Sequence, residues 1–439
     1  MFGKFKISFF FAFCCVLASV QVHANSLEQV LKETLQLNPT VRSAAAGEHA
    51  AQFEKKAAIA NFYPDINASV ATGPIFQENA TSRGFDVTRG ESFSGFGEVN
   101  VTLRQKIYDG NETRSQVNAA NARAESLNFM LRDTQERVAL NVSQAYMEIL
   151  RLRQNLAHLS AQKKTMGKYL YRIKKLSDEG VVELTEWQLA SDVLTIIEGN
   201  IIDHESQLLN AKSFYYEVVG SEPYDEMEMP SSISIELNTE LDDVIEDSVE
   251  KHPVVNSARM DSEAAKYDVN AQVGQTHPDV NGELSYLFSD KREDIGGSIT
   301  DARAVVRLNW NFSLGKRGDF SIKQKQFEHE EMLARQEEIE REIKRVIYQA
   351  YTAYQAAQKQ KEISNERVAL NEELLKSYKI QFEGSRISLL NLMRAENQLF
   401  NAKLEQINNQ FNALSAEYNV LATSGQLKKV ILAQDSINE

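Results

Sequence analysis

The chain has almost no cysteine, little glycine and little proline. Its 439 residues include 2 Cys, 20 Gly and 7 Pro. Both cysteines, Cys14 and Cys15, lie in an N-terminal segment that we expect to be removed, which would leave no thiol for disulfides, catalysis or metal binding. Phe13 precedes Cys14 where a lipid-modified cysteine follows a small residue, so we expect no lipid anchor. The scarcity of Gly and Pro predicts long uninterrupted elements.

The sequence also lacks a basic surplus and an extended apolar run. Its formal net charge is −14 at pH 7. This charge argues against a nucleic-acid partner, because nucleic-acid-binding proteins carry a basic surface. After the N-terminal segment, no stretch approaches the roughly 20 apolar residues of a spanning helix. The histidines are scattered without ligand spacing, so we expect no metal site. With no nucleophile motif or phosphate loop visible, we expect neither a cofactor nor an enzymatic activity.

Residues 1–24 are typical of a secretory signal peptide. Lys4 and Lys6 precede an apolar run over residues 7–20, and Val22-His23-Ala24 forms a small-x-small cleavage pattern. The run is shorter than a spanning helix needs, although a short membrane anchor is the alternative. We therefore expect export of the chain and removal of this segment.

Several motifs occur twice in the same order. Asn38-Pro39-Thr40-Val41 recurs as His252-Pro253-Val254-Val255, and Tyr63-Pro64-Asp65-Ile66 recurs at the same offset as His277-Pro278-Asp279-Val280. Gln144-Ala145-Tyr146 recurs as Gln349-Ala350-Tyr351, and Glu179-Gly180 recurs as Glu383-Gly384. This order predicts an internal duplication. We expect a first repeat at 25–220, an acidic linker at 221–239, a second repeat at 240–425 and a tail at 426–439.

Each repeat is expected to hold a broken helix, two strands and two long helices. The first helix spans about residues 27–61 and is interrupted by Pro39. No Gly or Pro occurs at residues 111–166 or 319–383, and apolar residues there and in the last helix recur in steps of three and four, as in a coiled-coil seam. The seams are Val138, Val142, Ala145, Ile149, Leu152, Leu156 and Leu159; Phe400, Leu404, Ile407, Phe411, Leu414, Tyr418 and Leu421; and a small-residue version, Ile339, Ile343, Val346, Ala350, Ala353 and Ala357. By itself this pattern also fits an ordinary helical scaffold.

Alternation of apolar and polar residues predicts the strands. Val99, Val101 and Leu103 alternate with polar residues, and so do Ala304, Val306, Leu308, Trp310 and Phe312 in the second half. Weaker alternation marks their partners, Ile66, Ala68 and Val70, and Val280, Leu284 and Tyr286. Such strands, with Phe93, Phe96, Tyr108, Trp310 and Phe312 as an aromatic girdle, suit a lipid-facing barrel. A strand of a soluble sandwich would alternate in the same way.

Four strands are too few to close a membrane barrel, whose smallest common form has about eight. An open sheet edge in lipid leaves backbone groups unpaired at high cost. Two chains would give a barrel whose interior is filled by side chains, whereas three would enclose a lumen. If these are membrane strands, we therefore expect a homotrimer with twelve strands.

The combination of signal peptide, duplicated plan and helix-hairpin turns resembles the TolC-like outer-membrane efflux family over nearly the whole mature chain. The closest match lies at residues 179–186 and 382–386, where Gly180 and Gly384 correspond to the turns between paired long helices. The resemblance implies a mixed α+β membrane protein with a long α-helical coiled-coil barrel and a transmembrane β-barrel. It places the protein in the outer membrane of a Gram-negative bacterium, in contact with outer-membrane lipid and extending into the periplasm.

The resemblance also implies partners and a passive role. A homotrimer would dock a periplasmic adaptor (membrane fusion) protein and, through it, an inner-membrane ABC transporter or a proton-driven pump. The absence of a lipid-modified cysteine and the stretch at residues 386–390 look more like the type I protein secretion branch. A small-molecule or multidrug efflux duct and a periplasmic scaffold without a pore are the alternatives.

Family members close their tunnel at the periplasmic tip through polar links, which implies a gate here. Arg386 matches the linking arginine, and Thr185 and Glu186 match its partners. A guanidinium suits this role because it bridges a carboxylate and a hydroxyl with several fixed donors. The plain alternative is a set of solvated charges at helix ends.

Two features depart from the family pattern. Gln381 stands where members often carry a tyrosine. The acidic residues that line the constriction in many members correspond to Asn391 and Arg394. We therefore expect a neutral or cationic constriction.

Overall fold

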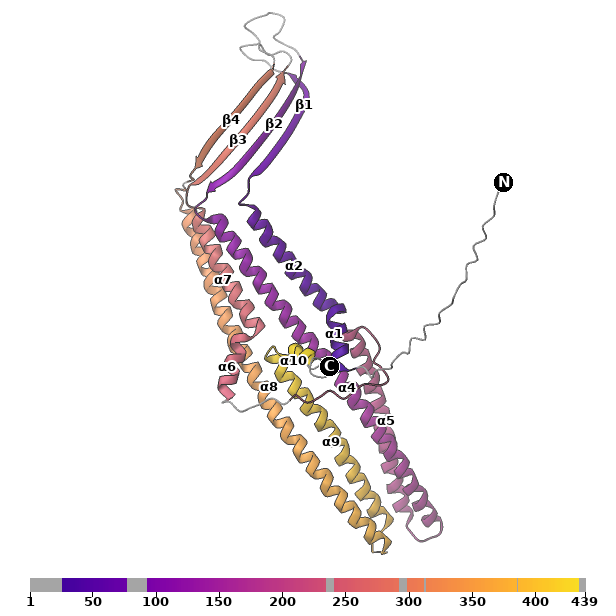
Figure 1. The fold of residues 1–439 in the computed structure, drawn as a ribbon. Helices are drawn as coiled ribbons and strands as arrows, with labels where there is room; N and C mark the ends of the chain where they lie inside the picture. The colour runs from indigo at the N-terminus through magenta and orange to yellow at the C-terminus, as the bar shows by residue number, and fades with distance from the viewer. Residues whose placement is uncertain are drawn as a thin grey trace, which may run out of the picture.

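The computed structural model describes residues 26–76, 93–233, 241–291, 298–311, 313–384 and 386–433. The chain is elongated, with a β-sheet at one end, helices along its length and two helix hairpins at the other end (Figure 1). The expected signal peptide, Phe312, and parts of the expected linker and tail lie outside the described residues.

The order of elements in the first half recurs in the second. The first half holds α1 (Leu27–Leu37), α2 (Pro39–Ala60), β1 (Asp65–Phe76), β2 (Phe93–Tyr108), α4 (Glu112–Asp178) and α5 (Leu184–Val219). The second holds α6 (Leu241–Lys251), α7 (Pro253–Gly274), β3 (Asp279–Lys291), β4 (Ser298–Asn309), α8 (Arg317–Glu383), α9 (Leu389–Thr423) and α10 (Leu427–Ala433). The limits of the two repeats stay a prediction.

A capped break before a proline separates the short helices of each half. Asn38 is extended, with φ −61° and ψ 126°, because a residue before proline avoids the helical region. Its Oδ1 accepts a hydrogen bond from the Thr40 N–H at 2.9 Å, and its Nδ2 donates to the Val218 carbonyl at 2.8 Å. In the second half, Nδ1 of His252 accepts from the Val254 N–H at 3.2 Å. Each side chain thus caps the helix that follows it.

The long helices α4 and α8 have 67 residues each, or about 100 Å at 1.5 Å per residue. The α4 seam is buried: Val142, Ile149, Leu152 and Leu159 are all 0% exposed. The small-residue seam of α8 differs from the prediction, because Ala353 is exposed. The buried α8 residues there include Ile347, Ala350, Tyr351 and Tyr354. Three large side chains and one alanine therefore form this part of the helix packing.

In the half of the molecule away from the sheet, the helices lie in the order α5, α4, α9, α8. Helix α4 packs against both α5 and α9, and α9 packs against α8 (Figure 1). Helices α5 and α8 are therefore the outer members of the row. Among the described residues, no helix is both long and apolar enough to cross a membrane.

The four strands form one antiparallel sheet in the order β1-β2-β3-β4. Leu103 pairs with Ile66 on one side and Leu284 on the other, and Leu284 pairs with Ala304. Because residues directly opposite each other point to the same face, the predicted apolar residues of all four strands share one face. The other face carries polar residues: Asn100, Thr102, Arg104, Glu283, Arg303 and Arg307.

The register corrects one part of the expected aromatic girdle. Phe96 pairs with Gly73 and lies an odd number of residues from Val99 along an unbroken stretch of β2. Since successive side chains alternate between faces, Phe96 lies on the polar face. Sequence alternation over a few residues did not reveal this, because Phe96 precedes the alternating segment.

Candidate functional site: the helix-hairpin tips and the exposed apolar faces

The first candidate site is the pair of helix-hairpin turns at the end opposite the sheet (Figure 1). In the α4–α5 turn, Gly180 has φ 76° and the Val181 N–H donates to the Leu176 carbonyl at 2.8 Å. A left-handed residue at this position is the usual end of a helix. In the α8–α9 turn, Gly384 has φ −80°, a conformation open to any residue, and the Arg386 N–H donates to the Gln381 carbonyl at 2.9 Å.

The predicted gate residues are separated within a single chain. Thr185 lies in the first turn of α5, where its hydroxyl donates to the Glu183 carboxylate at 3.1 Å. Arg386 is exposed in the other turn and Glu186 is half-buried. Within the described part of one chain, no hydrogen bond or ion pair joins Arg386 to either partner. The expected link therefore has to form between hairpins that a single copy does not bring together.

The predicted constriction residues lie side by side. Asn391 and Arg394 are both exposed on the first turns of α9, three residues apart, whereas Leu392 and Met393 are buried. Residues three apart on a helix are neighbours on its surface. Ser388 caps the helix by accepting from the Asn391 N–H at 3.3 Å. Gln381 is exposed near the end of α8.

A partly buried polar link ties the two hairpins together above the tips. The Tyr169 hydroxyl on α4 lies 3.2 Å from an Oε1 of Glu396 on α9, and Nζ of Lys379 on α8 lies 3.0 Å from the same oxygen. Burial, with the nearby Glu396 carboxylate, raises the pKa of Tyr169 to about 12. The sequence did not indicate Glu396, because no motif distinguishes it from the rest of the 62 acidic residues of the chain.

The second candidate site is the apolar face of the sheet. Val306 is 72% and Leu308 63% exposed. Val101 is also exposed, and Val99 and Leu103 are half-buried. Trp310 lies just past β4, where its Nε1 donates to the Thr276 carbonyl at 3.1 Å. Such a face, left uncovered by the chain itself, marks a contact with lipid or protein.

The outer helices also carry exposed apolar residues that the sequence reasoning missed. On α5, Ile202, Leu209 and Tyr216 are exposed at intervals of seven residues. On α8, Ile363, Leu370 and Leu374 form a similar exposed row. The heptad spacing was a readable signal, but only the structure shows that these rows lack a partner among the described residues.

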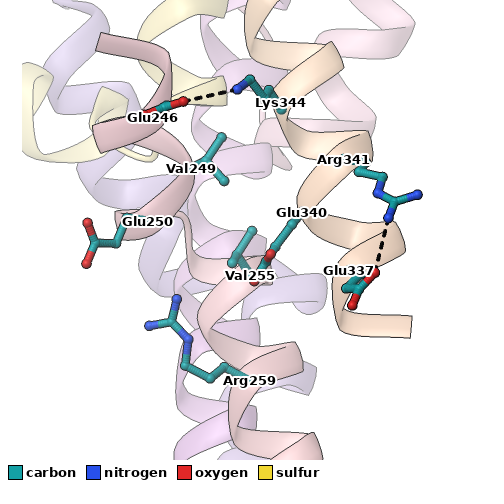
Figure 2. A pocket seen from close by; sticks show the side chains of 9 residues that line it. All are labelled: Glu246, Val249, Glu250, Val255, Arg259, Glu337, Glu340, Arg341 and Lys344. Atoms are coloured by element: carbon teal, nitrogen blue, oxygen red, sulfur yellow. Dashed lines mark hydrogen bonds and ion pairs between the residues drawn. The ribbon is translucent and has the colours of Figure 1, made fainter. Parts of the chain in front are cut away.

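A pocket of about 470 Å³ lies between α6, α7 and α8 (Figure 2). Glu246 pairs with Lys344 at 3.3 Å and Glu337 with Arg341 at 3.1 Å on its walls. These charges largely cancel, so the pocket has no chemistry that points to a substrate. Among the residues that the structure describes, no group of three or more His, Cys, Asp or Glu side chains is placed to hold a metal ion.

A family model described as "Outer membrane efflux protein" matches residues 30–220 and 244–426. Outer membrane efflux protein BepC of Brucella suis is 21% identical over 349 residues, which cover 78% of this chain and 76% of BepC. Outer membrane protein TolC of Escherichia coli is 21% identical over 431 residues, covering 92% of this chain and 83% of TolC.

Among solved structures, the outer membrane protein VceC of Vibrio cholerae superposes with a TM-score of 0.77 at 18% identity, covering 91% of this chain and 96% of VceC. This likeness shows a shared fold, with long helices and four strands from each chain. The family match covers both halves of the chain, and it indicates an efflux protein located in the outer membrane. The protein therefore belongs to the outer membrane efflux protein family, whose members are channels.

Proposed function

We propose that three copies of this chain form a closed duct through the outer membrane and periplasm. The observation that carries this proposal is the four-stranded sheet, whose apolar face is exposed and whose edge strands β1 and β4 lack a further strand among the described residues. Unpaired strand edges are not tolerated in lipid, so β1 of one copy pairs with β4 of the next. The residues that face lipid are then Val99, Val101, Leu103, Val306, Leu308 and Trp310, with Phe312 outside the described residues.

The outer helices support the same assembly. Helices α5 and α8 lie at opposite sides of the helical row and both expose apolar side chains at coiled-coil spacing. Packing α5 of one copy against α8 of the next buries both rows. The helices then continue the closed wall that the strands begin, and the polar face of the sheet lines the lumen.

The hairpin tips are proposed to form the gate of this duct. The guanidinium of Arg386 is exposed and has no side-chain partner within the described part of its own chain, and the Thr185 and Glu186 side chains lie on a separate hairpin. In a closed ring, these side chains meet across the junction between hairpins. Exposed links of this kind contribute only about 0–1 kcal/mol each, which suits a gate that a docked adaptor opens.

We further propose that the duct serves type I protein secretion, with an adaptor and an inner-membrane ABC transporter as partners. The stretch at residues 386–390 favours this branch, and so does Phe13, which stands before Cys14 in place of a small residue. The family description as an efflux protein favours small-molecule efflux as the second candidate, driven by a proton-coupled pump. A periplasmic scaffold is disfavoured because it would leave the apolar face of the sheet in water.

The experiment for the duct combines cross-linking with conductance recordings in planar bilayers. Trimeric cross-linked species and stepwise conductance are expected, and Arg386→Ala is expected to raise the open probability, with Arg335→Ala on α8 as a matched control. A protein that stays monomeric and never enters a membrane would contradict the proposal. Deleting the gene then separates the two cargo classes: loss of a secreted protein favours type I secretion, whereas drug sensitivity alone favours efflux.

A further inference from the structure

The half of α4 that leads to the tip has an unusual charge distribution for an acidic protein. Between Glu148 and Asp178 the helix contains no acidic residue. Its basic residues in this interval are Arg151, Arg153, Lys163, Lys164, Lys168, Arg172, Lys174 and Lys175. The corresponding end of α8 is mixed, with Glu372 and Glu373 beside Lys376 and Lys379. The basic surplus is therefore a property of this α4 segment and not of the hairpin as a whole, since α5 carries Asp192, Glu198 and Asp203 and has no Lys or Arg before Lys212.

Some of these cations stabilise the hairpin itself. Lys163 pairs with Glu198 of α5 at 3.0 Å. The Lys174 ammonium lies over the Trp187 ring, 5.4 Å from its centroid. These two contacts hold α4 to α5.

Three of the remaining cations, together with one tyrosine, form a straight row on one face of α4. Lys164, Lys168, Tyr171 and Lys175 follow each other in steps of four, three and four residues, so they share one face over about 16 Å. All four side chains are exposed, and Tyr171 is 75% exposed. The buried α4 residues of this stretch, among them Met166 and Ile173, lie on the opposite face. We name Lys164, Lys168, Tyr171 and Lys175 the basic row.

Little in the chain neutralises or covers this row. Among the described residues, the ion pair between Lys175 and the exposed Glu179, at 4.0 Å, is the one that involves it. Such a pair at the surface is weak. Helix α4 packs against α5 and α9 through its buried face, so copies that associate through α5 and α8 do not cover the exposed row. The row thus stays free in the proposed trimer.

We propose that the basic row docks a partner helix that carries acidic side chains at the same three-and-four spacing. This inference rests on the proposed function, since it describes a partner of the hairpin tips. The straight row matches a helix laid alongside α4, in which opposite charges set register and orientation. The exposed tyrosine at its middle is the residue type that anchors protein interfaces. An extended anionic polymer needs neither the helical spacing nor the aromatic anchor.

The test uses the purified full-length protein and two labelled synthetic peptides. One peptide is an amphipathic helix with glutamates along one face, and the other has the same composition with the glutamates distributed around the helix. Fluorescence anisotropy at low salt is expected to show tighter binding of the first peptide. The triple variant Lys164→Glu, Lys168→Glu, Lys175→Glu is expected to weaken it about tenfold or more, and wild-type binding is expected to weaken as salt rises.

A charge-matched control is available on other helices. Lys56, Lys266 and Lys323 are exposed on α2, α7 and α8, and replacing all three by Glu changes the net charge by the same amount. This control is expected to bind the first peptide as the wild type does. Equal binding of both peptides, or equal loss in both triple variants, overturns the inference in favour of general charge attraction. Binding of purified peptidoglycan or anionic vesicles without peptide binding also overturns it. Conductance of the same preparation reports separately on the proposed duct.

Discussion

At the scale of single residues, the two halves cap equivalent helices with different side chains. Asn38 caps α2 and His252 caps α7, each just before a proline. Histidine brings a titratable group into a site where it is only 6% exposed. Burial lowers the pKa of His252 to about 4, so the folded chain keeps it neutral where an unfolded histidine, with a pKa near 6.5, would bind a proton.

The first prediction concerns the stability of this cap. Because the unfolded state binds the proton more readily, the free energy of unfolding should fall as pH decreases from about 6.5 to about 4. The loss between pH 7 and pH 5 should be about 2 kcal/mol. His252→Asn should remove most of this slope and keep the cap, as Asn38 does. Urea unfolding at both pH values measures it, with the exposed His49→Asn as control. An unchanged slope in His252→Asn would contradict the assignment.

The second prediction concerns the constriction at the tip. Asn391 and Arg394 are exposed neighbours on α9 and carry no negative charge. Multivalent cations should therefore block the proposed channel only weakly, since no carboxylate ring attracts them. The double variant Asn391→Asp, Arg394→Asp should increase the block by at least about tenfold. Single-channel recordings with added divalent ions measure the block of the current. Strong block of the wild type would contradict the prediction.

At the scale of elements, a close backbone crossing joins the strands to the helices. Gly110, after β2, has φ 65°, and a Cβ built there would lie 2.6 Å from the Gly274 carbonyl oxygen at the end of α7. A Cβ on Gly274 would in turn lie 2.9 Å from the Glu112 nitrogen at the start of α4. The turn therefore needs glycine for both its conformation and its contact. This crossing fixes where the sheet meets the helices.

The third prediction follows from this crossing. Gly110→Ala should destabilise the fold by at least about 2 kcal/mol, through left-handed strain and the backbone clash. Gly199→Ala, in the interior of α5 with no atom within 4 Å of its added Cβ, should instead stabilise it by about 0.5–1 kcal/mol. Denaturant midpoints of the two variants compare these effects. Equal midpoints would show that the crossing is not tight in solution.

At the scale of the whole molecule, a single copy exposes several apolar surfaces. The sheet face and the outer rows on α5 and α8 are exposed in one copy. One apolar cluster within the copy lies between α1, α2, α4, α5, α9 and α10, and a second lies between α4, α5, α8 and α9. A single copy therefore exposes apolar side chains on both outer helices, α5 and α8, as well as on the sheet. This arrangement is the physical reason for expecting assembly.

The fourth prediction tests the exposed apolar row on α5. Leu209 is 66% exposed, and Leu209→Glu should weaken assembly strongly, because it places an unpaired charge in the proposed contact with α8 of the next copy. Cross-linking in detergent should show a shift from trimer to monomer. Gln207→Glu, at an exposed position on another side of the helix, should assemble normally. Normal assembly of Leu209→Glu would rule out this contact.

The sequence by itself determined the elements and their order. Prolines after Asn38 and His252 break the short helices, heptads such as Val138 to Leu159 specify the long ones, and alternation at Val99 to Leu103 specifies a strand. Each of these signals is local, so it can be read from neighbouring residues. The tip turns at Gly180 and Gly384 were predicted from the resemblance to the family.

Only the tertiary structure decided which faces are covered. It placed Phe96 on the polar face, exposed Ala353, assembled Tyr169, Lys379 and Glu396 from three helices, and left the basic row open. These facts depend on strand register and helix packing between residues far apart in sequence, and no periodicity within one element records them.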